Sequence, residues 1–113
     1  MGVDAVLYRR VRAGADRRRS SYISIEVVAD PQDVLLDLLT RVRGGGRTPL
    51  LDRVVPLGEL VVDADRVPHL LTELRCLAEA ARVPAETDQI RRLARLARRC
   101  LEGRDVEIRF EGD

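Results

Sequence analysis

The chain lacks most of the side chains with which enzymes do chemistry. Among its 113 residues there are one histidine, two cysteines and no tryptophan, and lysine is absent because all twenty basic residues are arginine. A catalytic site needs a nucleophile, a proton carrier or a metal cage at a defined spacing. His69 and Cys76 lie in one predicted helix, roughly 10 Å apart along its axis, whereas a Cys–His dyad needs a hydrogen bond of about 3 Å. We therefore expect no enzyme activity, no catalytic or metal-binding residue and no cofactor.

The sequence also lacks long apolar runs and a disulfide framework. No stretch approaches the roughly 18 apolar residues of a membrane span, and residues 1–13 alternate in polarity before the chain turns arginine-rich, unlike a signal peptide. Its two cysteines fall within predicted helices and are too few to cross-link a secreted domain. We therefore expect a cytoplasmic protein that does not associate with membranes.

What the chain does contain fits one packed domain over residues 1–113. Hydrophobic residues make up 45%, and the net charge is only +1 although 35% of the residues are charged, which argues against disorder. Only Tyr8, Tyr22 and Phe110 are aromatic, so we expect a mainly aliphatic core. Arginine in place of lysine is typical of GC-rich bacterial genomes. The alternative is that planar, bidentate donors bind phosphates or carboxylates.

Alternating apolar residues predict strands near both ends of the chain. Residues 3–11 and 22–29 alternate and are joined by a polar connection, which favours an antiparallel pair. Residues 106–110 alternate in the same way and predict a closing strand. The segment 50–63 holds two short apolar runs separated by Pro-Leu-Gly. A small hairpin is predicted there, although proline disfavours a strand.

Three helices are predicted between these strands. Asp30, followed by proline and a further acid, is typical of a helix start, and the apolar stripe continues to about residue 43, where three glycines end it. Apolar residues at helical spacing predict a second helix over residues 65–81 and a third over 85–102, which ends at Gly103. The sequence thus predicts an α+β fold in the order β-β-α-(β-β)-α-α-β, with three helices on one face of a small antiparallel or mixed sheet.

Polar residues at the start and on the outer side of the second predicted helix invite a functional interpretation. His69 and Cys76 fall opposite its leucine stripe, and a cysteine away from the core is unusual. We interpret them as candidate packing or interface residues, facing another element or a second subunit. Asp63 and Asp65 precede this helix and are typical of helix caps, although carboxylates at such a junction also suit a divalent cation or acid–base chemistry.

Charge is strongly segregated along the chain. Residues 1–20 hold six arginines and two aspartates, a net +4, and include the consecutive Arg17, Arg18 and Arg19. Residues 21–40 hold four acids and no arginine, a net −4, and the last nine residues hold four acids and one arginine, a net −3. The third predicted helix carries a polar face of five arginines: Arg91, Arg92, Arg95, Arg98 and Arg99. These arginines form either a solvated helix exterior or a docking surface.

The arginine clusters are the strongest indication of function. We expect a small bacterial, non-catalytic protein–protein interaction module, such as an adaptor, a subunit or a cognate inhibitor of the immunity type, that binds a protein partner or self-associates through these patches. The alternative is a nucleic-acid-associated protein that uses the arginine-lined helix, against which the net charge and the few aromatics argue. A third hypothesis, an enzyme or small-ligand sensor, requires a pocket lined by several polar groups such as His69, Asp63, Asp65 or the arginines.

Overall fold

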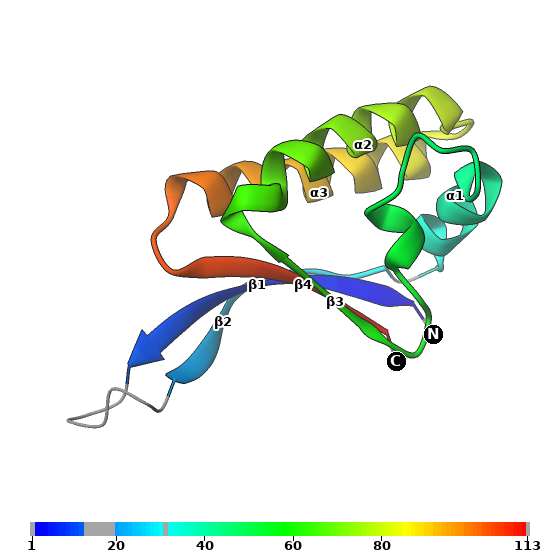
Figure 1. The fold of residues 1–113 in the computed structure, drawn as a ribbon. Coiled ribbons are helices and arrows are strands. Elements are labelled where there is room, and N and C mark those ends of the chain that lie inside the picture. Colours follow the sequence, from blue (N-terminus) through cyan, green and yellow to red (C-terminus); the bar gives the residue numbers. More distant parts are fainter. Residues whose placement is uncertain (1, 13–19, 31, 113) are drawn as a thin grey trace.

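The fold is a four-stranded sheet covered on one side by three helices. A computed structural model describes residues 2–12, 20–30 and 32–112, and Figure 1 shows their arrangement. The predicted fold class and order of elements are confirmed. In chain order the elements are β1 (Val3–Arg12), β2 (Ser20–Val28), α1 (Val34–Val42), the 3₁₀ turn η1 (Leu51–Arg53), β3 (Glu59–Asp63), the 3₁₀ turn η2 (Ala64–Arg66), α2 (Val67–Ala80), α3 (Pro84–Glu102) and β4 (Val106–Gly112).

The described strands form one antiparallel sheet in the order β2-β1-β4-β3. The first and last strands of the chain therefore lie side by side in its centre, where Ala5 of β1 pairs with Phe110 of β4 on one side and Val28 of β2 on the other. The strands β2 and β3 form the two edges. A bulge between Leu7 and Tyr8 shifts the register of β1 against β2 and increases the local twist of this pair.

All three helices lie on the same side of the sheet (Figure 1). Apolar residues recur every three or four positions along each helix, so that one stripe of each faces the strands. The stripe of α3, for example, is buried at Ile90, Leu93, Leu96 and Ala97. Burial of a leucine-sized side chain contributes roughly 1.5–3 kcal/mol. Phe110 is the one aromatic side chain in the described core, in line with the aliphatic core expected from the composition.

The structure differs from the sequence prediction in the segment 50–63. Its second part forms the strand β3, whereas its first part forms the turn η1. Leu50 and Leu51 are both buried, which a half-buried strand with alternating faces does not allow. The buried carboxylate of Glu73 in α2 accepts hydrogen bonds from the backbone N–H groups of Leu50 and Leu51, at 3.1 and 2.8 Å. This carboxylate stabilises a turn where the hairpin prediction places a strand.

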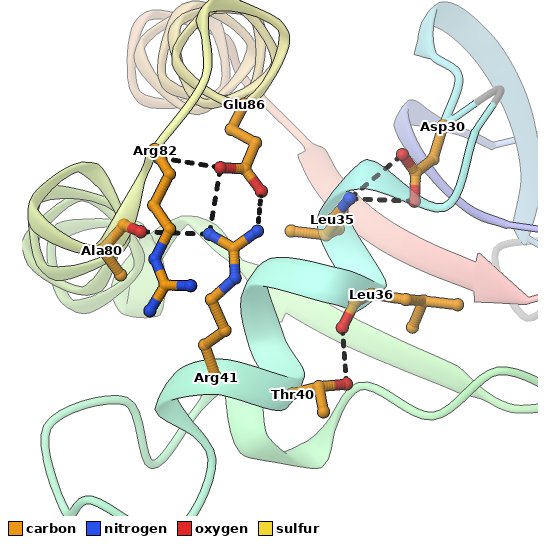
Figure 2. Close-up of polar contacts among 8 residues, drawn as sticks. All are labelled: Asp30, Leu35, Leu36, Thr40, Arg41, Ala80, Arg82 and Glu86. Atoms are coloured by element: carbon orange, nitrogen blue, oxygen red, sulfur yellow. Dashed lines mark hydrogen bonds and ion pairs between the residues drawn. The ribbon is translucent and has the colours of Figure 1, made fainter.

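Helix α1 begins at Val34, three residues later than the sequence predicts. Asp33 adopts a left-handed conformation with φ of 54°, so the chain turns before it enters the helix. Asp33, and not the predicted Asp30, is the N-cap residue, but the buried carboxylate of Asp30 accepts a hydrogen bond from the backbone N–H of Leu35 in the first turn at 3.1 Å (Figure 2). Burial raises the pKa of this carboxyl group. The predicted N-cap residue and the predicted first residue of the helix are therefore both wrong, although the carboxylate of Asp30 still bonds to the first turn.

No described helix covers the other face of the sheet (Figure 1). On this face the guanidinium of Arg109 lies over the rings of Tyr8 and Tyr22, 4.8 and 4.3 Å from their centroids, in a cation–π arrangement. Its Nε donates to the carboxylate of Glu107 at 2.7 Å, and the Tyr8 hydroxyl donates to Glu111 at 2.6 Å. These contacts tie β1, β2 and β4 together and place carboxylates beside the tyrosines.

Candidate functional site

The arginine-lined side of α3 is the candidate site. The helix begins with Pro84, at the first helical position, where the missing N–H of proline costs no hydrogen bond. Its apolar stripe faces the sheet, so the polar stripe faces solvent. All five arginines predicted for this stripe are exposed: Arg91, Arg92, Arg95, Arg98 and Arg99. The other predicted cluster, Arg17, Arg18 and Arg19, lies outside the described residues.

The five arginines of α3 lie beside different neighbours and do not form one continuous site. Arg92 and Arg95 line a groove between α3 and β2, and Arg99 also contacts β2. Arg91 lies near the connection between α2 and α3, and Arg98 lines a shallow groove between those two helices. The candidate surface therefore narrows to the side of α3 that faces β2.

The groove between α3 and β2 is flanked by two contacts that join the helix to the strand region. At one end, the side-chain N–H of Gln89 donates to the backbone carbonyl of Ala29 at 2.9 Å. At the other end, Arg99 forms an ion pair with Glu26 at 2.9 Å. The space between these contacts has a volume of about 320 Å³. It is lined by Glu26, Val27, Val28, Ala29, Arg92 and Arg95.

Neither arginine in the groove is paired with an acid among the described residues. Arg92 and Arg95 form no hydrogen bond or ion pair with any other residue that the structure describes. Glu26 is the carboxylate that lines the groove, and it is already paired with Arg99. A guanidinium carries five N–H donors in a planar fork that fits a carboxylate or phosphate. The groove is therefore suited to bind anionic groups.

A second cluster fixes the beginning of α3, and sequence reasoning missed it. The carboxylate of Glu86 binds the guanidinium of Arg41 in α1 through two hydrogen bonds, one of them 2.9 Å long, and accepts the backbone N–H of Arg82 at 2.8 Å (Figure 2). Arg41 also donates to the carbonyl of Ala80 at 3.1 Å. The hydrogen bonds from Arg41 lower the pKa of Glu86 to about 2. This cluster ties α1 to the turn between α2 and α3.

Only part of this cluster has a signal in the sequence. Glu86 is the third residue of α3, a position at which glutamate typically accepts a backbone N–H before the helix. Its local role was therefore predictable. Its partner Arg41 lies 45 residues away in the chain, and Gln89 contacts Ala29 from 60 residues away. No local pattern indicates either contact.

A cleft of about 470 Å³ lies at the start of α2. It is lined by Pro49, Leu50, Arg53, Asp65, Arg66, His69 and Glu73. His69 and Asp65 are thus brought to one cleft, which meets the condition set by the third hypothesis, but no hydrogen bond joins them in the described part of the chain. Asp63 takes the predicted role of a cap, since it accepts the backbone N–H of Arg66 at 3.2 Å. The carboxylate of Glu73 is already bonded to the backbone N–H groups of Leu50 and Leu51. The cleft therefore holds several described polar side chains that are not hydrogen-bonded to one another.

The two cysteines lie in different surroundings. Cys76 is partly buried beside Arg47, whose guanidinium pairs with Glu79 at 2.8 Å. That hydrogen bond and the neighbouring Cys76 side chain raise the pKa of Arg47. Cys100 is fully buried and donates to the carbonyl of Val106 at 3.8 Å, and burial raises its pKa to about 11. A buried thiol with a raised pKa is inert, so Cys100 is a structural residue.

The described residues hold neither a cluster of metal ligands nor a membrane-spanning helix. No group of three or more His, Cys, Asp or Glu side chains among them is placed to hold a metal ion. None of their helices combines the length and apolar character needed to cross a bilayer. Comparison of the chain with protein-family models, curated proteins and solved structures finds no match. What the groove binds is therefore inferred from its own chemistry.

Proposed function

We propose that the protein is a non-catalytic interaction module that binds an acidic segment of a partner protein in the groove between α3 and β2. The observation that supports this function is the pair Arg92 and Arg95, two neighbouring guanidinium groups with no acidic partner among the described residues. Charge-assisted, bidentate hydrogen bonds to carboxylates are among the strongest that proteins make. An adaptor, a subunit and a cognate inhibitor all have use for such a site.

The surroundings of the groove favour a protein over a nucleic acid. Clustered arginines attract phosphates, but single-stranded nucleic acids also stack their bases on aromatic side chains near the charge. Tyr8 and Tyr22 lie on the opposite face of the sheet from α3, near Glu107 and Glu111. A net charge of +1 gives little long-range attraction for a polyanion. A protein partner needs only a complementary acidic patch.

Fluorescence anisotropy with three labelled probes tests this function. The probes are poly-L-glutamate, a double-stranded DNA and a single-stranded RNA, each at low and high salt. We expect poly-L-glutamate to bind, and the variant Arg92→Glu/Arg95→Glu to bind it at least roughly tenfold more weakly. The matched control Arg91→Glu/Arg98→Glu makes the same change of charge on the same helix outside the groove, and should keep its affinity. Circular dichroism checks that both variants are folded.

Three outcomes contradict this function. Tighter binding of DNA or RNA, with a steep dependence on salt, supports the nucleic-acid alternative in its place. An equal loss of affinity in both variants shows that overall helix charge, and not the groove, attracts the probe. Absence of binding to any probe at low salt leaves the arginines as a solvated helix exterior.

A further inference from the structure

We infer that the partner lies in this groove as an added β-strand along β2, in a segment whose residues alternate between acidic and apolar. This inference rests on the proposed function and specifies the backbone conformation and sequence pattern of the partner. Two features carry it: the open edge of β2, and the position of two arginines beside that edge.

The first feature is that β2 is an edge strand. Among the described strands it pairs only with β1, so the backbone groups along its other edge have no strand partner. Such an edge is a template for another extended chain. The chain from Glu26 to Ala29 lines the groove together with Arg92 and Arg95. The open edge and the two guanidinium groups therefore border the same space.

The second feature is a match between the faces of an added strand and its surroundings. Glu26 and Val28 point toward the helices, because their partners on β1, Leu7 and Ala5, belong to the core. Val27 points to the uncovered face, where 53% of its surface is exposed. In an added strand, the residues opposite Glu26 and Val28 therefore face α3, and the residue between them lies beside Val27. Acidic residues suit the positions opposite Glu26 and Val28, because Arg92 and Arg95 line the groove and Glu26 is already neutralised by Arg99. Apolar residues suit the positions beside Val27.

The spacing of the charges also fits. Alternate residues of a strand lie roughly 6.6–6.8 Å apart on one face. Residues three apart on a helix, such as Arg92 and Arg95, have Cβ atoms roughly 5–6 Å apart, and their long side chains accommodate the difference. Two acids separated by one apolar residue can therefore contact both guanidinium groups at once. Main-chain hydrogen bonds to the strand edge add affinity that is independent of the side chains.

The same charges argue against a second copy of this chain as the occupant. A symmetric pairing of β2 with β2 places the same surface on both sides of the interface. Where such a pairing is centred on the groove residues 26–29, the arginines that line each groove are brought toward those of the other copy. Like charges across an interface are strongly unfavourable. The groove is therefore complementary to a different protein, one that carries an acidic extended segment.

Labelled peptides of equal composition test the strand. One capped peptide alternates glutamate and valine, and a second carries the same residues as a block of glutamates followed by a block of valines. Each is titrated with the wild-type protein, with Arg92→Glu/Arg95→Glu and with Arg91→Glu/Arg98→Glu. We expect the alternating peptide to bind wild type at least roughly tenfold more tightly than the block peptide. The first variant should lose this binding and the second should keep it.

Backbone methylation then tests the hydrogen bonds directly. Two versions of the alternating peptide carry N-methyl groups on every second amide, in one version on the glutamates and in the other on the valines. Successive N–H groups of a strand point to opposite edges. One version therefore loses its hydrogen bonds to β2, and the other retains them. We expect one methylated peptide to lose binding and the other to bind like the parent.

The outcomes separate this inference from the proposed function. If alternating and block peptides bind equally, and both methylated versions bind like the parent, the groove recognises acids without strand addition. The same holds if poly-L-glutamate binds and the alternating peptide does not. In both cases the interaction module stands and the added strand is wrong. If neither poly-L-glutamate nor any peptide binds, both are wrong.

Discussion

The first two turns of α3 and its middle differ in whether their polar side chains are buried and paired. Glu86 and Gln89 are buried, the former bound to Arg41 and the latter to the end of β2. One turn further along, Arg92 and Arg95 are exposed and have no partner in the described part of the chain. Polar contacts thus hold the start of the helix in place, whereas Arg92 and Arg95 in its middle make no contact among the described residues that stabilises the fold. This difference separates the residues that hold the structure from those available for binding.

Removal of Glu86 should give the largest effect on stability. In Glu86→Ala the guanidinium of Arg41 loses its acid and the backbone N–H of Arg82 loses its acceptor, and unpaired groups in such positions are costly. We expect the thermal unfolding midpoint, measured by circular dichroism, to fall by on the order of 5–10 °C. Glu102→Ala, at the exposed end of the same helix, should change it by less than about 2 °C. Equal effects of the two substitutions would show that the first turn is not the anchor.

Acid should weaken the same contact. The hydrogen bonds from Arg41 hold the pKa of folded Glu86 at about 2, against an ordinary value of 4.5. The ionised carboxylate therefore contributes its full stability above about pH 4.5, and this contribution is lost as the pH falls toward 2. Urea unfolding should show that wild type and Glu86→Gln differ in free energy of unfolding by a constant amount near neutral pH. This difference should disappear as the pH falls toward 2. A difference that does not change with pH contradicts this role of Glu86.

Gln89 should have a smaller effect. Gln89→Ala removes the hydrogen bond to the carbonyl of Ala29, and a single neutral hydrogen bond contributes about 1 kcal/mol. We expect urea unfolding to report a loss of about that size. Asp88→Ala, the exposed neighbour in the same turn, should stay within about 0.5 kcal/mol of wild type. If the two variants are equally stable, the contact between α3 and the end of β2 does not support the groove.

The arginines in the groove should have the smallest effect on stability. Arg92→Ala and Arg95→Ala remove exposed side chains without partners among the described residues, so the free energy of unfolding should change by less than about 0.5 kcal/mol. Arg99→Ala breaks a half-exposed ion pair with Glu26 and should cost up to about 1 kcal/mol. A loss above about 1 kcal/mol for Arg92 or Arg95 would make them structural residues and remove the contrast with Glu86.

The fold was predictable because its determinants are local. The alternation of residues 3–11 and the helical spacing of Ile90, Leu93 and Ala97 record which face of each element is buried. The segment 50–63 was not predictable in the same way. Its turn depends on Glu73, which bonds to Leu50 and Leu51 from 23 and 22 residues away. The carboxylate of Glu73 in α2 determines the conformation of this segment, and no pattern within the segment itself predicts that contact.

The candidate site was predictable as a surface but not as a groove. The five arginines at helical spacing indicate a basic face on α3. Which of them is free depends on acids that other elements bring near: Glu26 of β2 pairs with Arg99 and leaves Arg92 and Arg95 open. The strand order decides this, since β2 lies at the edge of the sheet beside α3. Charge patterning alone does not contain that information.

The stack of Tyr8, Arg109 and Tyr22 gives the protein a local optical reporter. The chain has no tryptophan and only these two tyrosines, so its near-ultraviolet emission arises from the uncovered face of the sheet. The hydrogen bond from the Tyr8 hydroxyl to Glu111 makes that emission sensitive to anything that disturbs the carboxylate. A ligand that changes the brightness has altered the surroundings of these tyrosines. One that binds without changing it leaves the surroundings of these tyrosines undisturbed, which a binding site on the helical side predicts.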